Sequence, residues 1–363
     1  GGKYEEIKNA AKAGVDINTD VANDSDTAAK SVSVKSTVYD KAGDIVSAQT
    51  DDIEIPAGAT KTISQSVEVL NPKLWSVDSP NLYWVRTEII QNGKVVDSTD
   101  SRFGIRYIAT DPNSGFYLNG VHTKLNGVCE HSDLGSLGME TYQAAVDRRI
   151  RTLKKYGVNA IRTSHNPVSP EFIEACDRLG MLVFEEAFDQ WLYSKNSDDY
   201  HNYFNKAADG KTVVFDKAGN DNTNNDTSYI EVKRDDLQSN AERDIKAMVE
   251  RDKNAPCIFA WSTGNEIYDA RYKHGENTLD MLTGWIKEID TTRPVAACPP
   301  TWDNYWANNA QQEKHLAKAE MSGFNYATGQ YDGAHSRYPN MVIFGSETVS
   351  AYYYRGVYFL EGE

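Results

Sequence analysis

Residues 158–186 read VNAIRTSHNPVSPEFIEACDRLGMLVFEE, and this stretch decides the fold class. It begins and ends with short apolar runs, at 158–164 and 181–186, of the kind found in strands buried on both faces. The segment between them carries apolar side chains on one helical face, at Phe172, Ile173, Cys176 and Leu179. Gly180 follows and is expected to end that helix. A strand, a helix and a second strand in this order predict a parallel pair with a right-handed crossover.

The same alternation continues on both sides of this stretch. Apolar residues at helical spacing predict two more helices, one over 142–153 that Gly157 ends, and one over 237–248 that ends before Pro256. Short apolar runs predict seven strands in all, at 123–130, 158–164, 181–186, 257–266, 294–298, 322–328 and 341–348. This pattern is typical of a β/α barrel or of an open doubly wound sheet.

Polar groups at the strand ends favour the barrel. They follow almost every predicted strand on its carboxyl side, as Glu130-His131, Ser164-His165, Glu185-Glu186, Asn265-Glu266, Asn325-Tyr326 and Glu347. All strand ends of a barrel meet on one face, which carries the chemistry, whereas a doubly wound sheet brings only a few together. The sequence also has no Gly-rich phosphate turn after the first strand. We therefore predict a (β/α)8 TIM barrel over residues 108–363.

Residues 1–107 follow a different pattern, in which apolar side chains recur at every second position. The clearest stripes lie at 15–21, 32–38 and 63–69, and turn residues at 40–44, 56–58 and Asn92-Gly93 separate the strands. This pattern predicts an antiparallel β-sandwich of about 100 residues. Two domains agree with a length of 363 residues. Packing alone must hold the core of the sandwich, because all four cysteines lie beyond residue 128.

Composition excludes several classes of protein. A net charge of −15 disfavours nucleic-acid binding, and no apolar run reaches the length of a membrane helix. The spacing of Cys129, Cys176, Cys257 and Cys298 fits no zinc ribbon, so we expect small, buried and reduced side chains. A Tyr-, Asn- and Asp-rich stretch runs from Trp191 to Asp236 and includes residues 221–226. We expect it to cover the catalytic face as a lid or subsite wall, and it lacks the Gly and Glu of a calcium loop.

Glu266 and Glu347 are the strongest candidates for catalysis. They end the fourth and seventh predicted strands, which lie across the mouth of a barrel from one another. An ionisable group at the end of a buried strand is costly unless it is paired or functional. Glycoside hydrolysis needs two facing carboxyls, one to donate a proton and the other to attack or stabilise the anomeric carbon. The two glutamates therefore predict a glycosidase.

Several motifs resemble those of glycoside hydrolase family 2, the family of β-galactosidases, β-glucuronidases and β-mannosidases. They cover nearly the whole chain and lie at 103–106, 115–120, 126–131, 159–167, 176–180, 251–256, 265–266 and 345–348. Within the family, the runs at 127–129 and 186–191 are most similar to those of bacterial β-galactosidases. The resemblance implies an immunoglobulin-like sandwich over 1–107 and a TIM-barrel catalytic domain after it.

The resemblance also implies a retaining, two-step mechanism. Glu347 would attack the anomeric carbon while Glu266 donates a proton and later activates water, with the carboxyls ~5–5.5 Å apart. Burial and the neighbouring Glu347 would raise the pKa of Glu266. The remaining roles implied are Asn265 on the sugar 2-hydroxyl, Tyr326 on the nucleophile, Arg162 as its counter-charge, His131 and His165 on sugar hydroxyls, and Asp189 with Trp191 in the subsite.

Alternatives to an exo-acting β-galactosidase remain open. A β-glucuronidase or β-mannosidase is one, because the family's Asn-x-Lys clamp for glucuronides lies beyond the nucleophile strand and the chain ends 16 residues after Glu347. A non-catalytic carbohydrate-binding or scaffold protein is another, although both glutamates are present. A metal-dependent barrel hydrolase could draw on His131, Asp133, His165, Glu186 and Asp189, but the first strand lacks a His-x-His pair.

The resemblance further implies a β-linked oligosaccharide or glycoconjugate as partner, with neither nucleic acid nor membrane, and it leaves a homo-oligomer open. We expect no metal ligands and no required cofactor, although some relatives carry accessory Mg²⁺ or Na⁺. Location is not readable, and the acidic, Tyr- and Asn-rich composition slightly favours a periplasmic or secreted protein. Because only seven of eight strands are found and the family's N-terminal jelly-roll domain is missing, we expect a portion of a longer polypeptide, cut before strand 8.

Overall fold

The computed structural model describes residues 5–7, 10–192, 195, 204, 239–301 and 310–350, with the side chains of Lys273 and His274 left out. The predicted loop over 191–236 therefore lies almost entirely outside the described residues. The chain forms two compact units. The first comprises residues 1–163, 167–185 and 247–260, and the second comprises 164–166, 186–246 and 261–363. These units divide the chain differently from the predicted division at residue 107.

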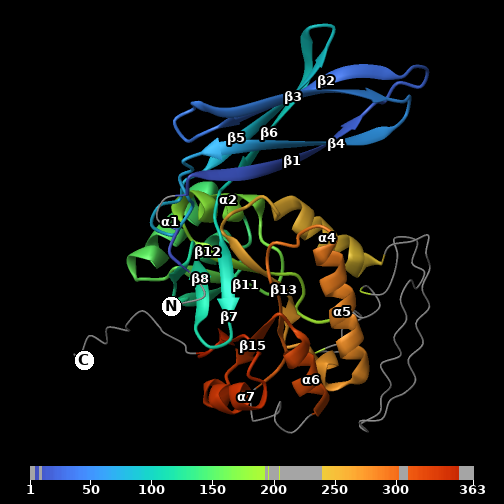
Figure 1. The fold of residues 1–363 in the computed structure, drawn as a ribbon. Coiled ribbons are helices and arrows are strands. Elements are labelled where there is room, and N and C mark those ends of the chain that lie inside the picture. The colour runs from blue at the N-terminus through green and yellow to red at the C-terminus, as the bar shows by residue number, and fades with distance from the viewer. Residues whose placement is uncertain are drawn as a thin grey trace. The chain divides into compact units, whose positions relative to one another are not determined.

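The first unit begins with the predicted β-sandwich (Figure 1). Its strands are β1 (Lys12–Ala22), β2 (Lys30–Tyr39), β3 (Ile45–Ile55), β4 (Thr60–Leu70), β5 (Tyr83–Gln91) and β6 (Lys94–Phe103). One antiparallel sheet has the order β1-β4 and the other β3-β2-β5-β6. Val34 and Val38, on the predicted stripe of β2, are fully buried in the core. The turn Asn92-Gly93 has positive φ at both residues, as a tight two-residue hairpin requires.

A small three-stranded antiparallel sheet follows the sandwich, and the sequence patterns did not predict it. It consists of β7 (Ile108–Asp111), β8 (Gly115–Leu118) and β9 (Val121–His122) in that order. Its strands have four, four and two residues, which is too short for a period-two pattern to be recognised. This sheet occupies part of the Gly115–Gly120 motif, where Asn119 donates its side-chain amide to the carbonyl of Trp75.

All seven predicted parallel strands are present among the described residues. They are β10 (Gly127–His131), β11 (Ala160–Ser164), β12 (Leu182–Glu186), β13 (Ile258–Asn265), β14 (Val295–Cys298), β15 (Met321–Asn325) and β16 (Ile343–Glu347). Their order within the sheet follows their order in the sequence without a reversal. A doubly wound sheet has a reversal point, so this sequential order confirms the barrel-type fold.

Helices connect these strands, as the alternation predicted. They are α1 (Gln143–Lys155), α2 (Pro170–Leu179), α4 (Asn240–Asp252), α5 (Lys273–Lys287), α6 (Ala310–Lys318) and α7 (Tyr331–Arg337), with short 3-10 turns at Gly135–Leu137, Tyr268–Arg271 and Thr328–Gln330. Ser169 caps α2 by accepting the Phe172 amide, and Gly180 ends it in the left-handed conformation, as expected. The predicted start of α4 near Leu237 lies outside the described residues.

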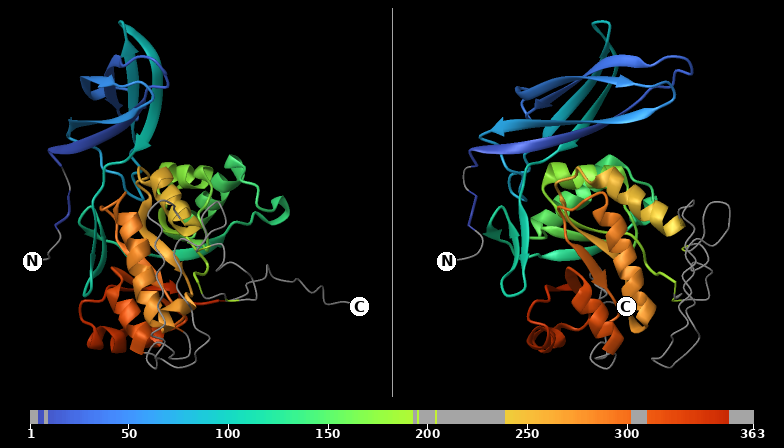
Figure 2. Two further views of the ribbon diagram at one scale, coloured as in Figure 1. Left: turned by 90° about the vertical axis from the view of Figure 1, so that its right-hand side faces the viewer. Right: turned by 45° about the vertical axis from the view of Figure 1, so that its right-hand side comes forward.

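Within the second unit, α5 and α6 pack against each other and along β14 and β15 (Figure 2). Leu316 of α6 and Phe324 of β15 are fully buried in a core that also contains Met341. This packing holds the carboxyl ends of β15 and β16 in place, because both strands are covered by the same apolar side chains. None of the helices that the structure describes is long and apolar enough to cross a membrane.

Cysteine placement differs from the prediction at one position. All four cysteines are free thiols, and Cys176, Cys257 and Cys298 are buried as expected. Cys129 is exposed, because it shares one face of the five-residue strand β10 with the exposed Gly127 and His131. The prediction of a buried side chain is therefore wrong for Cys129.

Candidate active site

The carboxyl ends of the strands in the second unit bring together most of the predicted site residues. His165, Asp189, Asn265, Glu266, Tyr326 and Glu347 all belong to this unit, as does Trp191. His131 and Arg162 belong to the first unit.

Glu347 is the last residue of β16, and its side chain is only 12% exposed. The Tyr326 hydroxyl donates a hydrogen bond to Oε2 of Glu347, and the Tyr326 amide donates to the Glu347 carbonyl. Burial and the hydrogen bond to Glu347 raise the pKa of Tyr326, so this phenol stays protonated as a donor. On the other carboxylate oxygen, Oε1 lies 3.7 Å from Nε2 of His165. Glu347 therefore has a fixed donor on Oε2 and is partly exposed at the end of β16.

His165 is held in orientation by a buried carboxylate. Its Nδ1 lies 2.7 Å from Oε1 of Glu186, whose other oxygen accepts a hydrogen bond of 2.6 Å from the Ser262 hydroxyl. The Glu186 side chain is fully buried. A carboxylate on Nδ1 favours the tautomer that carries its proton there, which leaves Nε2 facing Glu347 as an acceptor.

Glu186 and its neighbour Glu185 lie on opposite faces of β12, as the period of a strand requires. In the first unit, Glu185 pairs with Arg251, which also binds Asp252. The sequence motif around Arg251 thus contributes a buried ion-pair network. Both glutamates were predicted to be strand-end groups, but the position of Glu186 behind His165 was not predicted. Spacing in the sequence could not distinguish their roles, because the roles depend on which face of β12 each side chain occupies.

Glu266 directly follows β13 with a positive φ of 46°, and its side chain is 21% exposed. Burial raises the pKa of this carboxyl, and the negative charge of Glu347 raises it further. Lys195, the Asn325 amide and His165 act in the opposite direction but do not reverse the shift. The direction is the one predicted for the proton donor of a glycosidase.

Asn325 connects the two catalytic candidates through hydrogen bonds. Its side-chain amide donates to Oδ1 of Asn265 at 3.2 Å and to Oε1 of Glu266 at 3.5 Å. Its side-chain oxygen Oδ1 accepts a hydrogen bond of 2.6 Å from the Ser346 hydroxyl, one residue before Glu347. Asn325 and Ser346 are buried, and sequence analysis did not single out these contacts. They became visible only once β13, β15 and β16 were placed side by side.

Asp189 and Lys195 form a second polar group beside Glu266. The Asn265 amide and the Lys195 ammonium both bind Oδ1 of Asp189, at 3.0 and 2.7 Å. Burial acts to raise the pKa of Asp189, but these two hydrogen bonds outweigh it and lower that pKa. The ammonium also lies 3.8 Å from Oε2 of Glu266. Lys195 was not among the predicted residues.

Trp191 lies beneath the site rather than on its surface. The side chain is fully buried, its indole Nε1 donates to the Thr263 carbonyl at 2.8 Å, and its ring packs against His315. It therefore supports the end of β13 and presents no exposed ring in the described structure. The predicted place of Trp191 in the subsite remains a prediction.

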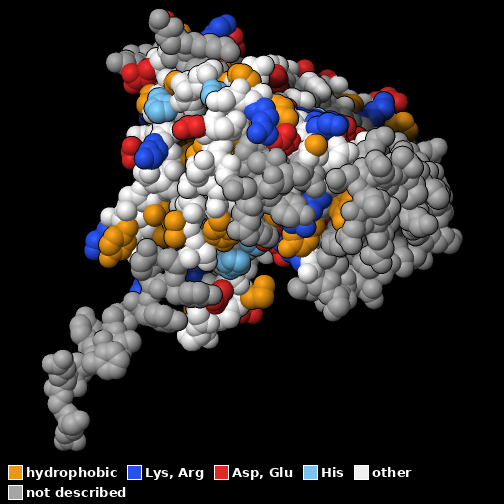
Figure 3. All heavy atoms as spheres, turned by 90° about the horizontal axis from the view of Figure 1, so that it is seen from below, with side chains coloured by type: hydrophobic (Ala, Val, Ile, Leu, Met, Phe, Trp, Pro, Cys, Tyr) orange, Lys and Arg blue, Asp and Glu red, His pale blue; other side chains and the backbone are white. Residues whose placement is uncertain are grey.

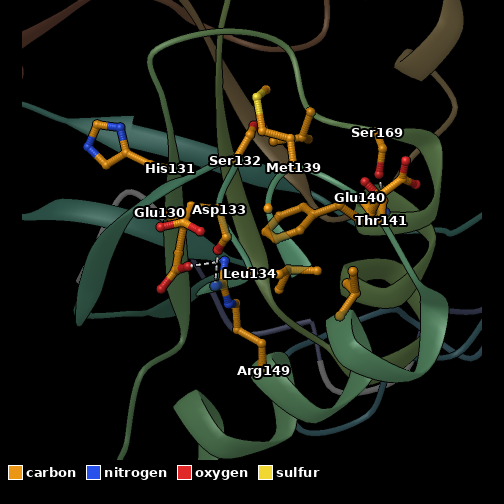
Figure 4. A pocket seen from close by; sticks show the side chains of 14 residues that line it. Glu130, His131, Ser132, Asp133, Leu134, Met139, Glu140, Thr141, Arg149 and Ser169 are labelled. Atoms are coloured by element: carbon orange, nitrogen blue, oxygen red, sulfur yellow. Dashed lines mark hydrogen bonds and ion pairs between the residues drawn. The ribbon is translucent and has the colours of Figure 1, made fainter. Parts of the chain in front are cut away.

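In the first unit, His131 is exposed at the end of β10 and lines a pocket with residues of the following loop (Figure 4). An ion pair of 2.8 Å between Arg149 and Glu130 lies on one side of this pocket, and Met139 lies across from it (Figure 4). Burial raises the pKa of Glu130. Arg162, on β11, is buried with Nη1 4.0 Å from Sγ of Cys129. The predicted roles of His131 and Arg162 remain predictions.

Acidic and basic side chains are interspersed over the described part of the face shown in Figure 3, so the net charge of −15 is not gathered there into one acidic patch. Within the ranges that the structure describes, no three His, Cys, Asp or Glu side chains are arranged to hold a metal ion. Both oxygens of Glu186, one of the candidate ligands, are already bound by His165 and Ser262.

The chemistry available to this arrangement is that of two carboxyls in different environments. Glu266 has a raised pKa, and the Tyr326 phenol donates a hydrogen bond to Glu347. A neutral carboxyl and a carboxylate at one site can supply a proton and a nucleophile to the same bond.

Comparison with known families agrees with both parts of the chain. Residues 3–106 match the family model described as "Glycosyl hydrolases family 2", and residues 110–321 match "Glycosyl hydrolases family 2, TIM barrel domain". These two matches cover the sandwich, the small sheet and most of the parallel strands.

Individual relatives point the same way. The chain is 31% identical to "Beta-galactosidase BoGH2A" of Bacteroides ovatus over 96% of its own length and 40% of that protein. It is 38% identical to a "Putative beta-glucuronidase" of Formosa agariphila over 63% of its length and 18% of that protein. A solved glycosyl hydrolase family 2 member from Bacteroides cellulosilyticus has a TM-score of 0.79 at 34% identity, over 93% of this chain and 38% of that one. The chain thus spans about two fifths of the first of these relatives.

Proposed function

We propose, because the chain belongs to glycosyl hydrolase family 2, that the full-length protein is a retaining, exo-acting β-glycosidase that removes terminal β-D-galactosyl residues. The observation that carries the proposal is the pair Glu266 and Glu347. The first has a raised pKa, and the second accepts a hydrogen bond from Tyr326 and lies 3.7 Å from His165.

In the first step, an oxygen of Glu347 attacks the anomeric carbon while the bond from that carbon to the leaving oxygen breaks. The proton of Glu266 moves to the leaving oxygen. In the second step, Glu266 takes a proton from water, the water oxygen bonds to the anomeric carbon, and the ester bond to Glu347 breaks. We expect the two carboxyls to lie ~5–5.5 Å apart, as retention requires.

The neighbouring residues supply orientation in this proposal. Asn265 hydrogen-bonds the sugar 2-hydroxyl, a contact that strengthens as charge develops on the ring. Tyr326 holds Glu347, and His165 offers Nε2 to a sugar hydroxyl beside the nucleophile. Asp189 lies next to Asn265, and its second oxygen accepts a hydrogen bond from a sugar hydroxyl. His131 and Arg162 are assigned the sugar-contact and counter-charge roles that the family resemblance implies.

Two observations favour a neutral sugar such as galactose over a glucuronide. The relative matched over 96% of the chain is named a β-galactosidase. The cation beside Glu266, Lys195, is already bound to Asp189 at 2.7 Å, so its charge is balanced without a substrate carboxylate. A β-glucuronidase is the second candidate, because a relative with that name is 38% identical over 63% of the chain. We propose no required cofactor, with accessory Mg²⁺ or Na⁺ as in some relatives.

The test is a substrate panel on the full-length protein. Aryl β-galactoside, β-glucuronide and β-mannoside are compared by kcat/KM, with and without a chelator. We expect the β-galactoside to give the highest value and the chelator to reduce it less than the change of substrate does. A highest value for the β-glucuronide would move the assignment to the second candidate. No hydrolysis of any of the three would favour a binding or scaffold role.

A further inference from the structure

A positively charged side chain lies between two carboxylates of the site and has no role in the mechanism above. Nζ of Lys195 lies 2.7 Å from Oδ1 of Asp189 and 3.8 Å from Oε2 of Glu266. Its side chain is only 16% exposed. An ammonium with this little contact with water interacts strongly with charges within 4 Å, because solvent screening is weak there.

Local structure fixes the position of Lys195. Its backbone amide donates a hydrogen bond of 2.9 Å to the side-chain oxygen of Gln190, the residue after Asp189. This contact returns the chain to the end of β12, so the ammonium meets the carboxylate of Asp189. The same oxygen of Asp189 also accepts a hydrogen bond from Asn265, which directly precedes Glu266. Lys195, Asp189, Asn265 and Glu266 thus form one connected group.

Other charged and polar groups face Glu266 from the remaining strands. Glu347 on β16 is negative, His165 after β11 contributes an imidazole, and Tyr326 after β15 is a neutral phenol. Asn325 on β15 contributes only an amide. In the second step Glu347 is esterified and has lost its charge. At that stage the newly formed Glu266 carboxylate lies 3.8 Å from the Lys195 ammonium, which is the permanent cation among the described residues named here.

We propose that Lys195 is a positioning residue of this site, which stabilises Glu266 as the carboxylate base of the second step and holds Asp189 against Asn265 for sugar binding. This inference rests on the proposed two-step glycosidase function. Without the ammonium, Glu266 would have to ionise beside Asp189 with no balancing charge, and the attack of water would be slowed. The proton donation of the first step needs the neutral carboxyl, so it would be affected less.

The inference is tested in the full-length protein with Lys195→Met, Lys195→Arg and Asp189→Asn. For Lys195→Met we expect the alkaline limb of kcat/KM to move up by about one pH unit, because a neighbouring positive charge is lost. For Asp189→Asn the limb should move down, because Lys195 then acts on Glu266 unopposed. Lys195→Arg should stay close to the wild type. Lys318→Met, on α6, removes a lysine that pairs with Asp280 and serves as the matched control.

A second readout separates a role in the base step from a loss of folding. With a dinitrophenyl glycoside, whose leaving group needs no proton, Lys195→Met should lower kcat about tenfold with little change in kcat/KM, and azide should restore kcat. An unchanged alkaline limb, or an equal fall in kcat and kcat/KM without azide rescue, would overturn the proposal. If the wild type hydrolyses none of the panel substrates, the proposed function fails instead, and that result is distinguishable.

Discussion

Asp290 and Glu266 are two carboxyl groups of the second unit, both tied to strand β13, and they are built in opposite ways. Asp290 lies between α5 and β14, and its side chain is 4% exposed. Its Oδ1 accepts from the Thr292 amide and hydroxyl, and its Oδ2 accepts from Trp261 Nε1 and Arg293. Burial acts to raise the pKa of Asp290, but Arg293 and the other donors outweigh it and bring it to about 2. Glu266, at the carboxyl end of β13, has a raised pKa.

The difference shows that hydrogen-bond donors distinguish an architectural carboxyl from a reactive one. Four donors on Asp290 leave no acceptor position for a reactant, so its charge is stabilised and its role is architectural. Glu266 has weak donors at 3.5 and 3.8 Å and can exchange a proton. The amino ends of the strands in a β/α barrel carry stability and the carboxyl ends carry chemistry, and these two residues follow that division.

Removing Glu347, the proposed nucleophile, should give the largest effect of any single change at the carboxyl ends. Glu347→Gln keeps the size of the side chain and the contact with Tyr326 but cannot form the glycosyl ester. We expect kcat/KM to fall on the order of 10⁴-fold or more. The thermal unfolding midpoint should change little. Steady-state kinetics and a thermal melt of the same preparation check both statements, and more than a tenth of the wild-type activity would contradict the assignment.

Removing the proton donor should have a smaller effect that depends on the leaving group. For Glu266→Ala we expect a loss of about 10²–10⁴-fold on a poor leaving group, since general acid catalysis supplies this much. On a dinitrophenyl glycoside the first step should proceed, and azide should form a β-glycosyl azide in the place of water. Product analysis by NMR checks the anomeric configuration. Equal losses for good and poor leaving groups would argue against Glu266 as the acid.

Removing Asp290, the architectural carboxyl, should lower stability and leave activity nearly unchanged, which is the reverse of the result expected for Glu347. Asp290→Ala takes the carboxylate away from the buried Arg293 guanidinium and from the Trp261 indole, so we expect a loss of about 3 kcal/mol in the free energy of unfolding. Activity per folded molecule should remain near that of the wild type at low temperature. Urea unfolding and active-site titration measure the two quantities. A stable variant with low activity would place Asp290 in the catalytic group and break the comparison.

Acid should weaken the protein through Asp290 in a defined pH range. Its pKa is about 2 in the folded chain and ordinarily about 3.8, so the carboxylate stabilises the fold above pH ~4, and this contribution falls as the pH drops towards 2. The contribution amounts to about 2 kcal/mol. The stability difference between wild type and Asp290→Ala should therefore shrink by this amount between pH 5 and pH 2. A constant difference would mean that Asp290 is not ionised selectively in the native state.

The strands and helices of the barrel were predictable because their patterns are strong and local. Runs such as 181–186 are apolar throughout and end in charge, and Gly180 marks a helix end that the structure has at that residue. The strands β7 to β9 were missed because they have at most four residues. Cys129 was placed in the core from its residue type, which says nothing about the face of β10 that it occupies.

Prediction of the site has the same limit, because residue type and spacing do not show which side chains meet in the fold. Position at a strand end was sufficient to predict four site residues that the structure places in one unit. They are Glu266, Glu347, His165 and Tyr326. It was not sufficient for Lys195, which follows the strand end by nine residues and returns to it through Gln190. Nor did it separate Glu186 from Glu185, although one supports His165 and the other pairs with Arg251.

The sequence by itself determined the order of strands and helices, the sandwich pattern before them, and the identity of the two glutamates. These features depend on side-chain type and on spacing within a few residues, which the chain carries directly. The tertiary structure decided which carboxyl is saturated with donors and which remains open to a reactant. That property depends on partners far apart in sequence, such as Trp261 with Asp290 or Tyr326 with Glu347, and only folding brings them within hydrogen-bonding distance.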